Sequence, residues 1–84
     1  MSDKKNHSVI IYSTPTCGFC HMAKDMLTEE GVPFTDKNVQ ADLVARQEMF
    51  SKTGGPSGVP VIDIDGTIIV GFDEEKVRGL LGLK

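Results

Sequence analysis

The sequence predicts a single α/β domain with the element order β-α-β-α-β-β-α. Apolar β-branched runs alternate with segments in which apolar residues recur at helical spacing, and glycine and proline separate the two kinds of segment. An Asp-Gly pair also joins the last two apolar runs, which is typical of a tight hairpin turn. A chain of 84 residues has room for one hydrophobic core. We therefore expect one domain over residues 8–84, preceded by a polar N-terminal extension over residues 1–7.

The first strand and helix are expected on either side of a short loop. The run Ser8 to Tyr12 is rich in β-branched residues and suits a strand buried on both faces. Thr14 and Pro15 end it. A helix is predicted from Gly18 to Glu30, followed by Gly31 as a C-terminal glycine, because one helical face collects the apolar residues Ala23, Met26 and Leu27.

The middle of the chain predicts a second strand and a second helix. Residues 34–39 alternate weakly and carry charges, which favours an edge strand. A helix over residues 42–53 would begin at Asp42 as N-cap and end before Gly54. The apolar residues Val44, Ala45, Met49 and Phe50 recur in it at helical spacing, so we expect them to form its buried face.

The last third predicts a hairpin and a closing helix. Strands over residues 61–64 and 67–70 would be joined by a type I′ turn at Asp65 and Gly66. Asp73 is expected to cap the last helix, with Lys84 at its end. The expected buried face of that helix is formed by Val77, Leu80 and Leu81.

Composition argues against nucleic-acid binding, membrane insertion and export. The net charge is −3 with acidic and basic residues interleaved, so no basic stripe is present for nucleic acid. The longest apolar runs are far shorter than the roughly 18 residues that span a bilayer. The first seven residues do not resemble a signal peptide. We therefore expect a cytoplasmic monomer that binds neither nucleic acid nor membrane.

Both cysteines lie between the first strand and the first helix, as Cys17-x-x-Cys20. A sulfur at a helix N-terminus meets free N–H groups and the positive end of the helix dipole, and such sites lower a cysteine pKa from about 8.5 towards 3.5–7.5. The thiolate is the nucleophilic form. In a reducing compartment this spacing indicates catalysis or metal binding rather than a structural disulfide. The stretch therefore predicts a redox site.

Haem binding and zinc binding fit the same stretch of sequence less well than a redox site does. Cys17-x-x-Cys20-His21 matches the attachment pattern of c-type haem, which requires an exported chain. A zinc site would need further ligands, and His7 and His21 are the only histidines. His21 could contact the thiolate, although a solvent-facing position on the helix is favoured, and Lys24 is expected on a solvated helix face.

Over residues 8 to 83 the chain resembles the thioredoxin fold and, by its length, the glutaredoxin family. The matching pieces are Thr14-Pro15-Thr16-Cys17-Gly18-Phe19-Cys20, Ala23-Lys24, Val59-Pro60 and Gly71-Phe72-Asp73. The resemblance implies a four-stranded mixed sheet flanked by three helices. It also implies a cis peptide before Pro60 and backbone hydrogen bonds from Val59 to a bound peptide or glutathione.

The resemblance further implies a thiol-disulfide oxidoreductase that reduces protein disulfides or glutathione mixed disulfides. Cys17 would be the nucleophile and Cys20 the resolving thiol, with no resident cofactor required. Glutathione is the implied co-substrate, and thioredoxin reductase is an alternative reductant because the Gly-Phe-Asp end is similar to members that use it. The implied binding residues are Thr16, Phe19, Val59, Pro60, Gly71, Phe72 and Asp73.

Departures from the family pattern keep a second hypothesis open. Classical members carry proline where Gly18 stands and a basic residue near Thr16, and the clamp on a glutathione carboxylate would fall to Lys52 or to nothing. Cys17-Gly18-Phe19 also resembles the monothiol glutaredoxin signature. The alternative function is therefore a [2Fe–2S] cluster-binding or carrier protein that uses Cys17 and glutathione in a dimer.

Overall fold

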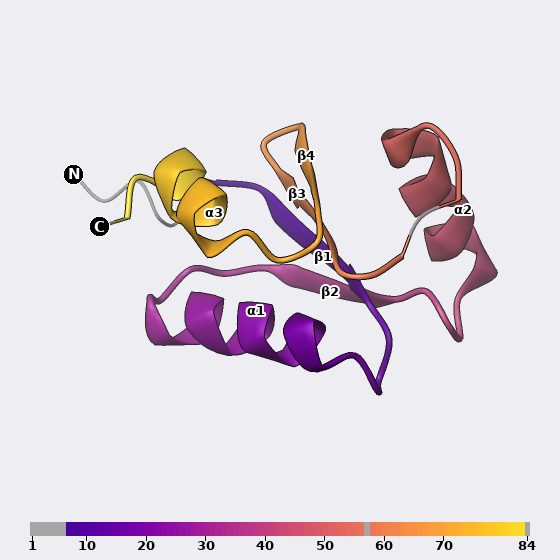
Figure 1. Ribbon diagram of the computed structural model, residues 1–84, viewed down its shortest axis with the longest axis horizontal. Helices are drawn as coiled ribbons and strands as arrows, with labels where there is room; N and C mark the ends of the chain where they lie inside the picture. The colour runs from indigo at the N-terminus through magenta and orange to yellow at the C-terminus, as the bar shows by residue number, and fades with distance from the viewer. Residues whose placement is uncertain (1–6, 57, 84) are drawn as a thin grey trace.

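A computed structural model describes residues 7–56 and 58–83 of the chain (Figure 1). The predicted order of elements is confirmed, whereas most of the predicted N-terminal extension and Lys84 lie outside the described residues. The strands are β1 (Val9–Ser13), β2 (Thr35–Asn38), β3 (Val61–Ile64) and β4 (Thr67–Val70). The helices are α1 (Gly18–Glu29), α2 (Leu43–Thr53) and α3 (Glu74–Leu81). No helix in these two ranges is long and apolar enough to cross a membrane.

The strands form one mixed sheet in the order β2-β1-β3-β4. Helix α1 returns the chain so that β2 pairs parallel to β1, and the other two strand pairs are antiparallel. The prediction of β2 as an edge strand is confirmed. Asp65 and Gly66 have φ values of 52° and 93°, as the predicted type I′ turn requires.

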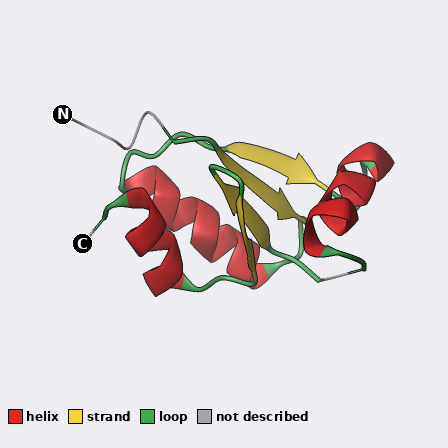
Figure 2. Ribbon diagram, turned by 90° about the horizontal axis from the view of Figure 1, so that it is seen from above, coloured by secondary structure: helices red, strands yellow, loops and turns green. Residues whose placement is uncertain are grey.

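The two faces of the sheet carry separate cores. Helices α1 and α3 cover one face and α2 the other (Figure 2). Alternation along β1 produces this division, because Val9 and Ile11 pack with α1 and α3 while Tyr12 packs with α2. Strand β1 is therefore buried from both sides, as predicted, and its C-terminal end leads directly into the cysteine loop.

Two predicted core positions are wrong. Val44 in α2 is 74% exposed and Leu80 in α3 is 36% exposed. Each helix buries a narrow i, i+4 stripe, Ala45 and Met49 in α2 and Val77 and Leu81 in α3. Val44 and Leu80 each stand one position before a buried residue, Ala45 and Leu81, and one position is a rotation of about 100° around the helix, which turns their side chains out of the contact.

The predicted helix caps are confirmed. Asp42 accepts from the backbone N–H groups of Val44 and Ala45 at 3.0 and 3.2 Å, and Asp73 accepts from the N–H of Lys76 at 3.3 Å. Gly54 ends α2 with a φ of 82°, in the left-handed region that glycine adopts without strain.

Candidate active site

Cys17 is the N-cap residue of α1. Its backbone is extended, with φ −85° and ψ 111°, and its Sγ accepts a hydrogen bond from the Cys20 N–H at 3.1 Å. The two cysteines form a disulfide with their Cα atoms 5.2 Å apart. The first turn of the helix therefore directs a backbone N–H at this sulfur, the position in which a thiolate gains stabilisation.

The two cysteines differ in exposure. Cys17 is partly exposed, whereas Cys20 has no exposed surface and belongs to the buried side of α1. A disulfide in another molecule can therefore approach the Cys17 sulfur but not the Cys20 sulfur. This asymmetry is what a nucleophile and a resolving thiol require.

The loop before Cys17 is held by its own backbone and by His21. The Cys17 N–H donates to the Thr14 carbonyl at 3.3 Å, and the His21 Nε2 lies 2.9 Å from the Pro15 carbonyl oxygen. His21 is exposed, as expected for a solvent-facing helix residue. Its ring contacts the loop backbone, so its role in the structure is to fasten the loop to the first turn of α1.

Asp36 joins β1, β2 and α1 just below this loop. One carboxylate oxygen accepts from the Ser13 hydroxyl at 2.6 Å and the other from the Lys24 ammonium group at 2.9 Å. Lys24 therefore does not lie on a freely solvated face, contrary to the prediction. Partial burial raises the pKa of Asp36, but the hydrogen bonds from Ser13 and Lys24 outweigh burial and lower the pKa below its usual value.

Two segments remote in sequence meet beside the loop. The Val59–Pro60 peptide is cis, as the family resemblance implied, and Pro60 is buried while Val59 is partly exposed. The Gly71 N–H donates to the Pro60 carbonyl at 2.7 Å. This bond ties the segment before β3 to the segment after β4, so Val59, Pro60 and Gly71 form one unit.

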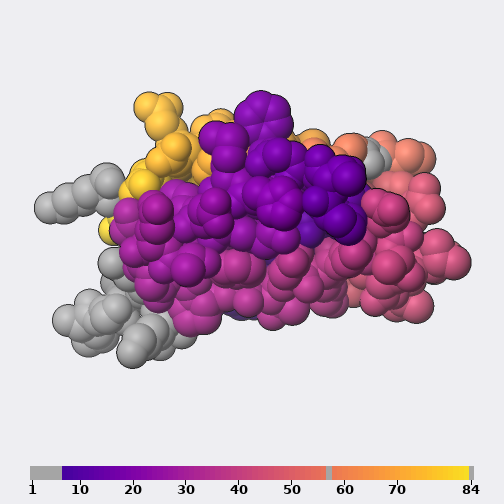
Figure 3. Space-filling view, turned by 90° about the horizontal axis from the view of Figure 1, so that it is seen from below, coloured from indigo at the N-terminus to yellow at the C-terminus, as the bar shows by residue number. Residues whose placement is uncertain are grey.

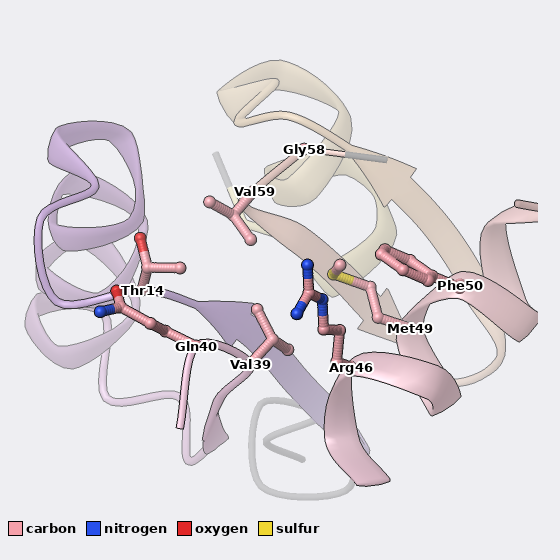
Figure 4. A pocket seen from close by; sticks show the side chains of 8 residues that line it. All are labelled: Thr14, Val39, Gln40, Arg46, Met49, Phe50, Gly58 and Val59. Carbon is pink, nitrogen blue, oxygen red and sulfur yellow. The ribbon is translucent and has the colours of Figure 1, made fainter. Parts of the chain in front are cut away.

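A groove of about 280 Å³ opens between this unit and helix α2 (Figure 4). Thr14 and Val59 form one end of the groove, and the Arg46 side chain of α2 points into it. The Arg46 guanidinium carbon lies 5.8 Å from the centre of the Phe50 ring, and Arg46 forms no ion pair with the rest of the described chain. The remaining lining residues are Val39, Gln40, Met49, Phe50 and Gly58.

Lys52, the cation considered from the sequence, is turned away from the groove. Its ammonium group donates to Asp63 at 2.6 Å and lies 5.0 Å from the centre of the Tyr12 ring. Burial disfavours its charge, but the hydrogen bonds with Asp63 and Tyr12 outweigh burial and raise the pKa of Lys52. Tyr12 is fully buried and donates its hydroxyl to Glu48, so it packs in the core beneath α2.

Sequence reasoning missed Arg46. The available signal was its position on α2, one turn before Met49 and Phe50, which places a cation at the edge of an apolar stripe. That signal could not separate Arg46 from Lys52. The cation left available to a ligand is the one that forms no ion pair within the described fold. Asp63 of β3 pairs with Lys52, so Arg46 is the available cation.

The other predicted binding residues are spread around the loop. Thr16 and Phe19 are exposed next to the two cysteines. Phe72 is partly buried against the core beneath α1 and α3, and Asp73 is exposed while its carboxylate caps α3. Of the predicted binding residues, only Val59, Pro60 and Gly71 are thus connected to one another by the contacts described above.

Comparison with known proteins gives one consistent result. The family model "Glutaredoxin" matches residues 9–69. The chain belongs to the glutaredoxin family. It is 48% identical over 71 residues to an uncharacterised glutaredoxin-like 8.6 kDa protein from the rubredoxin operon of Clostridium pasteurianum, covering 84% of this chain and 93% of that protein.

Two further proteins carry the family name. Glutaredoxin 3 of Escherichia coli strain K12 is 37% identical over 67 residues, covering 80% of each chain. The crystal structure of a glutaredoxin from Archaeoglobus fulgidus superposes with a TM-score of 0.78 at 26% identity, covering 88% of this chain and 85% of that one. The protein is thus a glutaredoxin-like thiol-disulfide oxidoreductase with a Cys17-x-x-Cys20 redox pair.

The carboxylate beneath the loop makes a pH-dependent contribution to stability. Because the pKa of Asp36 is lowered by folding, its contribution is present above its ordinary pKa of about 3.8 and is lost as pH falls through the lowered value. We predict that Asp36→Asn lowers the free energy of unfolding by about 1 kcal/mol near pH 7, a small value because the side chain is partly exposed. The difference from wild type should shrink at an acid pH well below 3.8, because the carboxylate is protonated as the pH falls through its lowered pKa.

Urea unfolding of both proteins at the two pH values measures this. Asp25→Asn is the matched control, because Asp25 is exposed and makes no ion pair within the described residues. A destabilisation by Asp36→Asn that is equally large at both pH values would contradict a role for the ionised carboxylate.

Proposed function

We propose that the protein reduces protein disulfides and glutathione mixed disulfides through a dithiol cycle of Cys17 and Cys20. The observation that carries the proposal is the pairing of a partly exposed sulfur at the N-cap of α1 with a fully buried second sulfur three residues later. The first can be reached by a substrate and the second can be reached only by the first.

The cycle transfers two electrons from the dithiol to the substrate. The Cys17 thiolate attacks one sulfur of the substrate disulfide, the S–S bond breaks, and the leaving thiolate takes a proton from water. The Cys20 sulfur, once deprotonated, attacks the Cys17 sulfur, which releases the second substrate thiol and leaves the Cys17–Cys20 disulfide. Two glutathione molecules or a dithiol reductase such as thioredoxin reductase restore the dithiol.

The groove beside Val59 suits glutathione as the co-substrate. Glutathione is a peptide with free carboxylates, and Arg46 presents at the apolar wall of the groove a guanidinium that forms no ion pair with the described residues. We propose that Arg46 takes the role considered for Lys52 and that the Val59 backbone, next to Pro60, pairs with the peptide. Gly71, Phe72 and Asp73 lie after β4, where the other end of the ligand would reach.

The iron–sulfur alternative has less support from the residues present. A [2Fe–2S] cluster needs four ligands, and no group of three or more His, Cys, Asp or Glu side chains that could hold a metal occurs within the described residues. Cys20 is buried, so one chain offers a single accessible thiol. The remaining ligands would have to come from a second subunit and from glutathione.

The roles of the two cysteines are tested by serine variants. We predict that Cys17→Ser abolishes turnover of a glutathione mixed disulfide and of a protein disulfide, because it removes the attacking sulfur. Cys20→Ser should keep mixed-disulfide turnover within about tenfold of wild type, since free glutathione replaces the resolving thiol, and should lose protein-disulfide reduction. NADPH oxidation coupled to glutathione reductase, run beside thioredoxin reductase, measures both activities and identifies the reductant.

An inactive wild-type protein in both coupled assays would overturn the proposed function. Equal loss of mixed-disulfide turnover in Cys17→Ser and Cys20→Ser would contradict the separate roles of the two sulfurs.

The proposed role of Arg46 is tested by measuring the KM for glutathione. We predict that Arg46→Ala raises KM for glutathione by up to about fivefold with little change in kcat, because an exposed ion pair contributes at most about 1 kcal/mol to binding. Arg46→Lys should recover part of the loss. Gln47→Ala, at the next and exposed position of α2, is the control and should leave KM unchanged. An unchanged KM in Arg46→Ala would remove Arg46 from the site.

A further inference from the structure

The outer face of α1 carries large apolar side chains next to the redox pair. Phe19 is 63% exposed and Met22 is 53% exposed, and the three-residue spacing places them one above the other on the helix surface. Figure 3 shows side chains from the first turns of α1, in violet, projecting beside the orange and yellow segment of α3. Single exposed apolar residues need no explanation, but two adjacent ones beside a nucleophile indicate a contact surface.

A second depression continues this surface between α1 and the start of α3. It has a volume of about 270 Å³, and its apolar wall is formed by Met22, Met26 and Phe72. Phe72 packs on the core beneath α1 and α3, so this wall is fixed in place. The depression therefore offers an apolar binding surface that begins at Met22, two residues after Cys20.

The rim of this depression is acidic. Asp25, Glu29 and Glu74 line it together with Arg78. Arg78 donates to Glu74 at 2.8 Å and to Glu30 at 3.0 Å, so its charge is engaged inside the fold. Asp25 and Glu29 form no ion pair with any described residue and are exposed. A net negative charge therefore surrounds the apolar binding surface.

The two depressions beside the redox pair consequently differ in charge. The groove at Val59 presents Arg46, whereas the depression at Phe72 presents uncompensated carboxylates. A small anion such as glutathione is attracted to the first and repelled by the second. An occupant of the second depression would therefore have to differ from glutathione in charge.

We infer that the acidic apolar face, formed by Phe19, Met22, Asp25, Glu29, Phe72 and Glu74, docks disulfide-bearing protein substrates in which an apolar side chain and basic residues flank the cysteine. The inference deepens the proposed function and rests on it. A second copy of this chain is a poor occupant, because the same face would meet its own charge. An anionic membrane surface is excluded for the same reason.

The test uses two synthetic peptides, each closed by one disulfide and alike in length and apolar residues, with either lysines or glutamates flanking the cysteines. The chain is reduced beforehand, and its single-turnover oxidation by each peptide is followed at low and high salt. Each rate is divided by the rate of the same peptide with free dithiothreitol, which removes the intrinsic reactivity of the disulfide.

The lysine peptide should react about tenfold faster than the glutamate peptide at low salt, and the ratio should fall towards one at high salt. Glu29→Gln and Asp25→Asn should each lower the rate for the lysine peptide severalfold and leave turnover of a glutathione mixed disulfide unchanged. Glu75→Gln, which removes an exposed acid outside the depression, is the control and should change neither rate. Met22→Gln should slow both peptides, because it removes part of the apolar binding surface.

Equal normalised rates for the two peptides, or an equal response to Glu29→Gln and Glu75→Gln, would overturn the inference while mixed-disulfide turnover leaves the proposed function intact. Failure of the chain to reduce either peptide or the mixed disulfide would instead overturn the proposed function itself.

Discussion

The hydrogen bond from the Cys20 N–H to the Cys17 sulfur is the interaction on which the site depends. It exists because a strand buried on both faces ends at Ser13 and a helix starts at Gly18, with a loop short enough to leave Cys17 at the N-cap. The same geometry turns Cys20 into the helix and buries it. The helix start alone therefore gives the two sulfurs different exposure, which is the basis of the roles proposed for them.

The surroundings of the sulfur are assembled from distant parts of the chain. The bond from Gly71 to Pro60 joins the segments on either side of the β3–β4 hairpin, and Asp36 ties the end of β1 to its neighbours. Around this frame the surface divides into a groove with a cation and a depression with carboxylates. Under the two proposals above, the cationic groove would attract a small anionic thiol and the acidic depression a basic protein segment.

The sequence predicted most of the fold because its local signals agree with one another. The caps at Asp42 and Asp73, the Asp65-Gly66 turn and the edge strand β2 all follow from short-range chemistry. The exposure of Val44 and Leu80 did not follow, because it depends on how each helix is rotated on the sheet. The ion pair between Lys52 and Asp63 could not be predicted either, because it joins different elements of the fold. Sequence reasoning therefore did not identify Arg46 as the cation in the groove. The position of the cysteines was predicted, whereas the cis peptide before Pro60 rested on the family resemblance.

The central claim, that the helix start activates Cys17 and shields Cys20 from molecules in solution, is tested most directly by alkylation. The reduced protein is treated with iodoacetamide at a series of pH values, and the modified cysteine is identified by peptide mapping. The account predicts that Cys17 is modified first and that its rate is half-maximal well below about pH 8.5, the value for an ordinary thiol. Equal modification of both cysteines, or a midpoint at or above that value, would contradict it.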